Sequence, residues 1–270
     1  MSRHTLLGVW AHPDDEAYLS AGLMAEFRQR GYRVVMVTAT LGEHGTSDPD
    51  VWPPDRLAAL RHRELRNSLA ALDVDELHLL GFEDGTCHLH DGTAAIASLI
   101  ADIEPDFIVT FGPDGMTGHP DHKAVSHWTT QARESIRPTA SLWYATITPD
   151  FHRRWGRVND QIGLWADQPK PPITHPSELA RTTVLTDELL DRKVAALRAH
   201  HSQTRPSSSS SATTPTANGG APNHSETPTS HQTALTPPTP CDEPPSHRHP
   251  PRWHRPSQRP TQPGRLTRAA

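Results

Sequence analysis

Two short segments place histidine and acidic side chains beside a proline, each directly after an apolar run. The first reads HPDDE, from His12 to Glu16, and follows the apolar residues 6–10. The second reads HPDH, from His119 to His122, and follows the apolar residues 107–111. Imidazole nitrogens and carboxylate oxygens are the usual protein ligands of zinc and related metals. The two segments are therefore candidates for one shared metal site.

His12, Asp15 and His122 make a ligand set of two histidines and one carboxylate, which leaves metal positions open for water and substrate. Asp14 is then free to take a proton from a metal-bound water, whose pKa the metal lowers to about 7. His119 would supply positive charge or a proton where an oxyanion or a leaving amine develops. Together these residue types predict a metal-assisted amide hydrolase.

Simpler explanations exist for each segment alone. HPDDE is also typical of a helix start, because proline fits the first helical position and acidic residues in the first turn suit the helix dipole. The second segment, in the matching position after another strand, makes that explanation insufficient. Glu16 suits a dipole role or a role behind the metal ligands better than direct ligation.

The remaining sequence alternates strand and helix patterns. Apolar runs predict strands at residues 6–10, 34–39, 77–80, 107–111 and 142–147, and amphipathic segments predict helices at 17–30, 56–72, 93–103 and 120–136. Continuous apolar runs are typical of strands buried on both faces of a parallel sheet. We therefore predict an open, mostly parallel α/β sheet with helices on both faces.

Such sheets bind ligands outside the carboxyl ends of their strands, where the strand order reverses. In the common doubly wound order, the first and fourth strands are neighbours across that reversal. The two histidine segments follow these two strands, so the fold is expected to bring them into one crevice.

The composition changes abruptly after Gln203. We predict a catalytic domain over residues 1–204 and a Pro/Ser/Thr-rich disordered tail over residues 205–270, because the tail lacks apolar periodicity. The net charge of −5 divides into about +4 in the tail and −9 in the domain. A frame-shifted C-terminus would explain the tail as well as a native disordered segment does. Both explanations predict that the tail adds nothing to the core.

Composition also limits the partners. A net charge of −5 and a pI of about 6.4 give no reason to expect nucleic acid as a partner. The two cysteines, Cys87 and Cys241, are far apart, which favours a reducing, cytoplasmic compartment over a disulfide framework. No apolar run approaches the roughly 20 residues of a membrane span. The oligomeric state stays open.

Several motifs resemble the signature of the LmbE-like, or PIG-L, N-deacetylase superfamily. The matching segments are AHPDDE at 11–16, TLGEHG at 40–45, RHRE at 61–64, GFEDG at 81–85, GHPDH at 118–122 and KVAALRAHHSQ at 193–203. The resemblance implies a Rossmann-like fold and a zinc-dependent enzyme that removes acetyl groups from N-acetylglucosaminyl compounds or cleaves related amides. The expected partner is thus a small sugar or sugar conjugate.

Residue roles also follow from this resemblance. It implies zinc on the set His12, Asp15 and His122, with Asp14 as general base and His119 as stabiliser of the tetrahedral intermediate. Fe²⁺ would suit the same ligand set. The resemblance also implies that Asp121 orients or tunes a histidine, and that Arg61 and Asp84 contact the substrate. Relatives continue with folded chain after the His-x-Ser-Gln stretch, whereas here the tail follows, so the substrate pocket could be incomplete.

Two other functions fit the same residues. The ligand set is also that of Fe(II) oxygenases, although a spare aspartate beside the metal favours hydrolysis. A binding or regulatory protein that has lost turnover is the second alternative. Zinc content with acetate release would indicate the hydrolase, and oxygen consumption would indicate the oxygenase.

Overall fold

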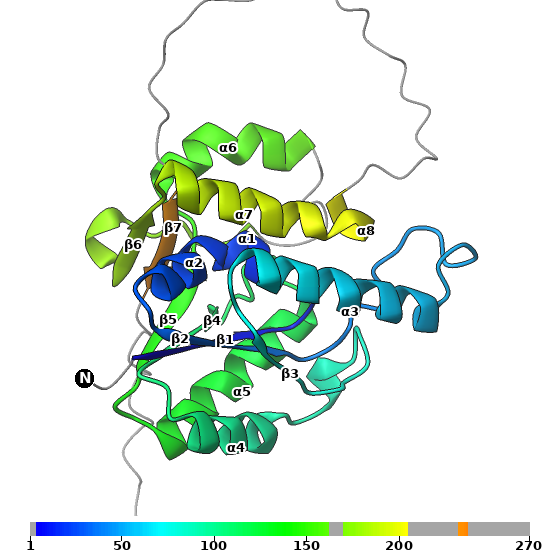
Figure 1. Ribbon diagram of the computed structural model, residues 1–270, viewed down its shortest axis with the longest axis horizontal. Helices are drawn as coiled ribbons and strands as arrows, with labels where there is room; N and C mark the ends of the chain where they lie inside the picture. The colour runs from blue at the N-terminus through cyan, green and yellow to red at the C-terminus, as the bar shows by residue number, and fades with distance from the viewer. Residues whose placement is uncertain (1–3, 162–169, 205–231, 237–270) are drawn as a thin grey trace, which may run out of the picture. The chain divides into compact units, whose positions relative to one another are not determined.

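The computed structural model describes residues 4–161, 170–204 and 232–236. Its strands and helices alternate along the chain as the apolar patterns predict (Figure 1). The strands are β1 (Thr5–Trp10), β2 (Arg33–Thr38), β3 (Glu76–Leu79), β4 (Phe107–Phe111), β5 (Ser141–Thr146), β6 (Arg181–Val184) and β7 (Gln232–Thr236). The helices are α1 (Asp15–Leu19), α2 (Ala21–Gln29), α3 (Pro54–Ala71), α4 (Thr93–Ile103), α5 (Pro120–Ile136), α6 (Pro149–Gln161), α7 (Asp187–Ala199) and α8 (His201–Thr204).

Within the described residues, the strands form one seven-stranded sheet in the order β3-β2-β1-β4-β5-β7-β6. The first five strands in this order are parallel, and β7 runs antiparallel to both β5 and β6. The predicted α/β class with a mostly parallel sheet is therefore confirmed. As expected, β1 and β4 are neighbours, so their carboxyl ends lie side by side.

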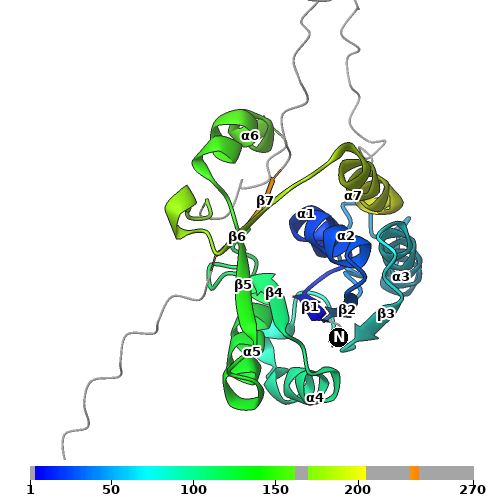
Figure 2. The ribbon, with the colours of Figure 1, turned by 60° about the vertical axis from the view of Figure 1, so that its left-hand side comes forward.

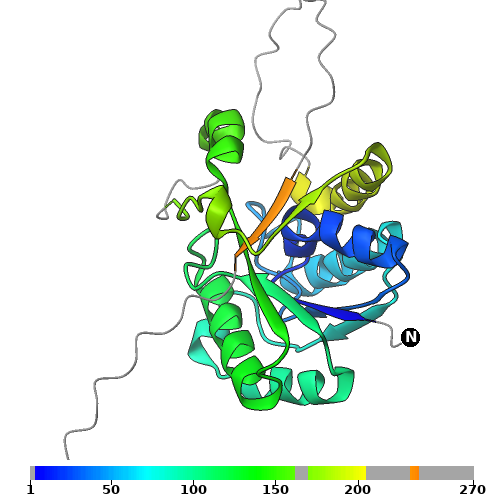
Figure 3. The same cartoon turned by 90° about the vertical axis from the view of Figure 1, so that its left-hand side faces the viewer.

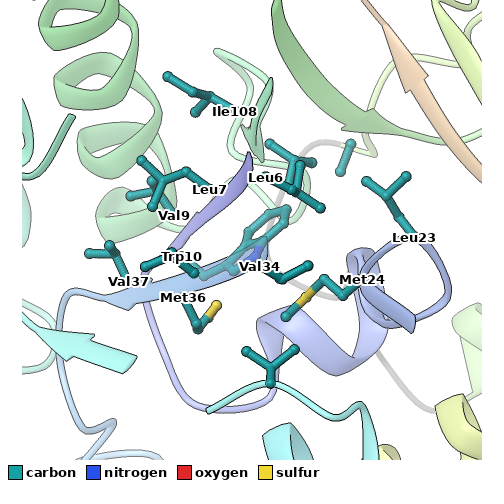
Figure 4. Close-up of a cluster of buried hydrophobic side chains, with 14 of the residues drawn as sticks. Leu6, Leu7, Val9, Trp10, Leu23, Met24, Val34, Met36, Val37 and Ile108 are labelled. Atoms are coloured by element: carbon teal, nitrogen blue, oxygen red, sulfur yellow. The ribbon is translucent and has the colours of Figure 1, made fainter. Parts of the chain in front are cut away.

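Helices cover both faces of the sheet (Figure 2). Helices α4 and α5 pack together on one face, and α1, α2, α3 and α7 gather on the other. The core between the layers is built from the apolar strand residues that the sequence pattern indicated. Figure 4 shows part of it, where the fully buried side chains of Leu6 and Trp10 meet Met24 and Met36. Among the described residues, no helix has the length and apolar character to cross a membrane.

One predicted helix is divided. The segment expected as a single helix at 17–30 forms α1 and α2, which meet at Ser20. The backbone of Ser20 leaves helical geometry (φ −133°, ψ −3°), and its hydroxyl donates to the carbonyl of Glu16 at 3.2 Å. A serine hydroxyl that binds a local carbonyl competes with the helix, which explains the break.

The structure also corrects the expected role of the tail. The segment Gln232–Thr236 was expected to add nothing to the core, but it forms strand β7 between β5 and β6 (Figure 3). Leu235 on this strand is fully buried. Its five residues alone were too short to show a periodic pattern amid the polar sequence around them. The rest of the predicted disordered tail, 205–231 and 237–270, lies outside the described residues.

Candidate metal centre

His12 and His122 meet at the carboxyl edge of the sheet. His12 lies two residues after β1, and His122 lies in the first turn of α5, which follows β4. Because β1 and β4 are adjacent parallel strands, the two imidazoles come together with His12 Nδ1 3.1 Å from His122 Nε2. Both rings are buried. The predicted convergence of the two segments is thus present in the structure.

The outer nitrogen of each ring has a hydrogen-bond acceptor behind it. His12 Nε2 lies 3.1 Å from Asp84 Oδ1 and 3.3 Å from Asp121 Oδ2, and His122 Nδ1 lies 2.9 Å from the carbonyl of Gly115. When these outer nitrogens donate, the lone pairs of His12 Nδ1 and His122 Nε2 point into the space between the rings. Metal-binding histidines are oriented by partners of this kind.

Asp15 completes a three-sided arrangement. One carboxylate oxygen, Oδ2, lies 3.7 Å from His12 Nδ1, and the other, Oδ1, lies 3.5 Å from His122 Nε2. Ligand atoms bound tetrahedrally at about 2.1 Å are separated by about 3.4 Å, and two spacings are close to this value: 3.1 Å between the two ring nitrogens and 3.5 Å between His122 Nε2 and Asp15 Oδ1. The 3.7 Å distance to His12 Nδ1 belongs to the other oxygen, Oδ2, which also accepts the backbone N–H of His12 at 2.8 Å. His119 also brings a ring nitrogen within 4.8 Å of nitrogens of His12 and His122. The residues present therefore fit a divalent metal.

The charges around the rings are arranged in favour of a cation. Burial alone would lower the pKa of His12, but hydrogen bonds to Asp121 and Asp84 outweigh it and raise the pKa to about 10. At His122, burial lowers the pKa well below its usual value, and the charge of His12 lowers it further. His12 thus carries a proton that compensates the buried carboxylates. A divalent cation between the rings would replace that proton and would compensate the negative charge of the carboxylates more completely.

Asp14 stands beside this site with a backbone conformation that is rare for aspartate. It is the residue before α1 and has φ 107°, in the left-handed region, at a cost of order 1–3 kcal/mol. Its side chain is 20% exposed, and Oδ1 lies 3.6 Å from Arg61 Nη2. Burial raises the pKa of Asp14 to about 7, against the opposing charge of Arg61. A carboxylate with that pKa can accept a proton near neutrality and release it again.

His119 is the N-cap of α5. Its Nδ1 accepts the backbone N–H of Asp121 at 3.2 Å, which leaves Nε2 as the nitrogen that carries hydrogen. Its ring centre lies 4.9 Å from that of His12 and 5.1 Å from that of His122. Burial lowers the pKa of His119, and the nearby charge of His12 adds to this. A neutral ring with one N–H is suited to donate a hydrogen bond into the site.

Asp121 lies behind His12 in a fixed position. Its side chain is fully buried, and its oxygens accept the backbone N–H groups of Gly85 at 2.7 Å and Cys87 at 3.0 Å. Its Oδ2 also lies 3.3 Å from His12 Nε2, and its Oδ1 lies 3.9 Å from His88 Nδ1. The family resemblance predicts that Asp121 orients or tunes a histidine.

The two residues expected to contact substrate have partners inside the protein. Asp84 is buried, lies against His12 Nε2 and accepts the backbone N–H of His44 at 3.0 Å. Burial opposes ionisation of Asp84, but the hydrogen bond with His12 outweighs it and lowers the pKa to about 2. Asp84 thus lies behind His12, and its contact with the substrate stays a prediction.

Arg61 is 3% exposed and donates to the carbonyls of Gly42 at 2.8 Å and Pro13 at 2.5 Å. Gly42 has φ +64°, and a side chain there would overlap the Arg61 guanidinium. Arg61 thus holds the loops around the site together. These two bonds use two of the five N–H donors of the guanidinium, and a direct sugar contact of Arg61 stays a prediction.

The contacts of the Glu16 side chain could not be predicted from the sequence. Its side chain is fully buried and lies between Ser68 on α3 and His200 at the end of α7, with Oε1 2.6 Å and 2.8 Å from their side chains. The only signal in the sequence was the family-like HHSQ stretch that begins at His200. No spacing rule connects residues 184 positions apart.

Comparisons with known proteins agree with this architecture. The sequence profile of the PIG-L family, described as GlcNAc-PI de-N-acetylase, matches residues 7–133. A 1D-myo-inositol 2-acetamido-2-deoxy-alpha-D-glucopyranoside deacetylase from Acidothermus cellulolyticus is 32% identical, over 74% of this chain and 79% of that protein. A protein of the same name from Mycolicibacterium gilvum is 31% identical, over 75% of this chain and 82% of that protein.

Solved structures show the same fold at lower identity. The N,N'-diacetylchitobiose deacetylase from Pyrococcus horikoshii superposes with a TM-score of 0.54 at 20% identity, over 74% of this chain and 71% of that one. The A40926 pseudoaglycone deacetylase Dbv21 superposes with a TM-score of 0.56 at 19% identity, over 75% and 83% of the two chains. By sequence profile and by its identity to these relatives, the chain belongs to the PIG-L (LmbE-like) de-N-acetylase family.

Proposed function

We propose that this chain hydrolyses the N-acetyl amide bond of an N-acetylglucosaminyl sugar conjugate with the help of a divalent metal. The observation that carries the proposal is the convergence of His12, Asp15 and His122, whose ring nitrogens lie 3.1 Å apart and each within 3.7 Å of an Asp15 oxygen. Asp14 directly precedes Asp15 in the chain. The substrate class is supported by the relatives, which are named as deacetylases of an acetamido-glucopyranosyl inositol.

His12, Asp15 and His122 would hold the cation, which when bound lowers the pKa of a water to about 7 and polarises the amide carbonyl. Asp14 takes a proton from the water as its oxygen attacks the acetyl carbon. His119 donates a hydrogen bond from its Nε2–H to the carbonyl oxygen as negative charge develops there. The C–N bond then breaks, the proton held by Asp14 passes to the leaving nitrogen, and acetate and a free amine are released.

The same three ligands would also suit an Fe(II) oxygenase. The placement of Asp14 favours hydrolysis, because a carboxylate with a pKa near 7 has a use in proton transfer to and from water. A protein that only binds its ligand is the remaining alternative. It would need neither the strained conformation of Asp14 nor its shifted pKa.

The test uses the full-length protein, analysed for metal and assayed for acetate release from N-acetylglucosaminyl inositol, lipid and thiol conjugates. We expect about one divalent ion per chain and acetate release from at least one substrate. Asp14→Asn serves as the matched control for contaminating activity, since it changes one acceptor atom and no metal ligand. Oxygen consumption with no acetate would indicate the oxygenase, and tight ligand binding without turnover would indicate the binding protein.

A further inference from the structure

Glu16 is the centre of a buried hydrogen-bond cluster that reaches the proposed base. Its Oε2 accepts the backbone N–H of Asp14 at 3.0 Å. Its Oε1 accepts the hydroxyl of Ser68 at 2.6 Å and faces His200 Nε2 at 2.8 Å. Glu16 and His200 both have fully buried side chains. The cluster therefore joins α1, α3 and the C-cap of α7 through one carboxylate.

The same peptide group is held at its other end by Arg61. The carbonyl of Pro13 and the N–H of Asp14 belong to one peptide unit, and Arg61 Nη2 donates to that carbonyl at 2.5 Å. A buried cation thus holds the oxygen of the peptide unit while a buried carboxylate holds its hydrogen. Rotation of this unit would change φ of Asp14, so the two contacts together fix that angle.

The angle matters because φ 107° is unfavourable for a residue with a Cβ atom. Such a conformation persists only where its surroundings over-determine it. If the peptide unit were free to turn, the Asp14 side chain would move relative to Asp15, the next residue along the chain. A misplacement of about 1 Å at a reacting group typically costs about 100-fold in rate.

We propose that Glu16 is a positioning residue, which holds the backbone of Asp14 in its left-handed conformation and is itself held in place by His200. The proposal rests on the proposed function, because it acts through Asp14 as the base. It also explains why the third acid of the HPDDE segment is fully buried although it is no metal ligand in the arrangement described above. The three neighbouring carboxylates point to three different partners: Asp14 toward Arg61, Asp15 toward the histidines, and Glu16 toward Ser68 and His200.

The test compares Glu16→Ala, Glu16→Gln and His200→Ala in the full-length protein. We expect Glu16→Ala to keep most of its metal and to lower kcat by roughly 10- to 100-fold with little change in KM, the loss typical of residues behind a reacting group. Glu16→Gln should recover part of this loss, because its amide oxygen can still accept from Asp14. His200→Ala should lower kcat less than Glu16→Ala does.

Glu26→Ala is the matched control. Glu26 is a mostly buried carboxylate that bonds to Arg181 and Thr183, so its removal costs stability without touching Asp14. It should lower the melting temperature but leave kcat unchanged. Wild-type kcat in Glu16→Ala, or a loss fully explained by missing metal, would overturn the positioning role.

The rate of hydrogen exchange at the backbone amide of Asp14 reports on its hydrogen bond to Glu16 and needs no assay of activity. Exchange should be faster in Glu16→Ala and His200→Ala and unchanged in Glu26→Ala. If the wild-type protein releases no acetate, the proposed function fails while this measurement still decides whether Glu16 holds Asp14. Unchanged exchange in Glu16→Ala overturns the proposal whatever the activity.

Discussion

His12 Nδ1 and His122 Nε2 lie 3.1 Å apart, although 110 positions separate the two residues in the chain. Two nitrogens that both point their lone pairs at one space repel each other unless a proton or a metal ion lies between them. The carboxylates behind His12 favour positive charge in that space. The pair is thus the structural basis for each expectation about metal that follows.

Metal binding should depend on both histidines. We predict that His12→Ala and His122→Ala each lose most of the bound zinc, because two remaining ligands leave the site open to solvent. Glu16→Ala should keep most of it and serves as the control. Metal analysis after dialysis gives the result, and normal metal content in both histidine variants would refute the ligand assignment.

Catalysis should separate from metal binding at Asp14. Asp14→Asn preserves the size of the side chain but removes its ability to accept a proton. We expect the metal to remain while kcat falls by about 100-fold or more, within the range of general-base losses. Full activity with a full complement of metal would show that another residue acts as the general base.

His119→Ala should lower kcat and spare most of the metal, since its Nε2 hydrogen is assigned to the developing charge on the carbonyl oxygen. His119→Gln is a useful comparison, because its amide N–H can still donate. We expect partial recovery of kcat in that variant. A loss of metal equal to that of His122→Ala would instead show that His119 is a ligand.

The carboxylates behind His12 should affect metal affinity. Asp84→Asn and Asp121→Asn each replace a charged partner of His12 Nε2 by a neutral one, and outer partners of this kind are typically worth about 10- to 100-fold in affinity or activity. Competition with a chelator measures the change. If Asp84→Asn raises KM alone and leaves metal affinity intact, Asp84 acts on the substrate, as its family position implied.

The strand in the tail should contribute to stability. Leu235→Ala removes a fully buried side chain, and such changes cost about 2–5 kcal/mol. Urea unfolding followed by tryptophan fluorescence measures this free energy. Leu89→Ala, at a side chain that is 70% exposed, should change it by less than about 0.5 kcal/mol. Equal values for the two variants would mean that β7 is not part of the folded core in solution.

The positions of the first five strands could be predicted from the sequence, because each is an apolar run that ends in a clear turn. Apolar runs buried on both faces look alike whatever their neighbours, so the pattern located these strands but not their order. The adjacency of β1 and β4 was expected from the common doubly wound order. The sequence pattern did not predict strands β6 and β7. The sequence RTTV of β6 and QTALT of β7 contains few large apolar residues, and their pairing depends on contacts with β5 and each other.

The candidate metal site followed from residue types and strand order, because the histidine segments directly follow two strands whose adjacency is typical of the fold. The contacts of Asp84 with His12 and of His200 with Glu16 could not be predicted from the sequence. Asp84 reaches His12 from a loop after β3, and His200 reaches Glu16 from the end of α7. Such contacts depend on how the loops and helices close over the sheet edge, which local patterns do not encode.

The position of β7 has a consequence for synthesis of the chain. Strand β5 ends at residue 146, but the strand that pairs with its outer edge begins at residue 232. At ribosomal rates of about 5–20 residues per second, roughly ten seconds pass between the two. During that interval the outer edge of β5 lacks the strand that pairs with it, while β6 and α7 are still being made. A chaperone that covers this edge would have its greatest effect before residue 236 leaves the ribosome.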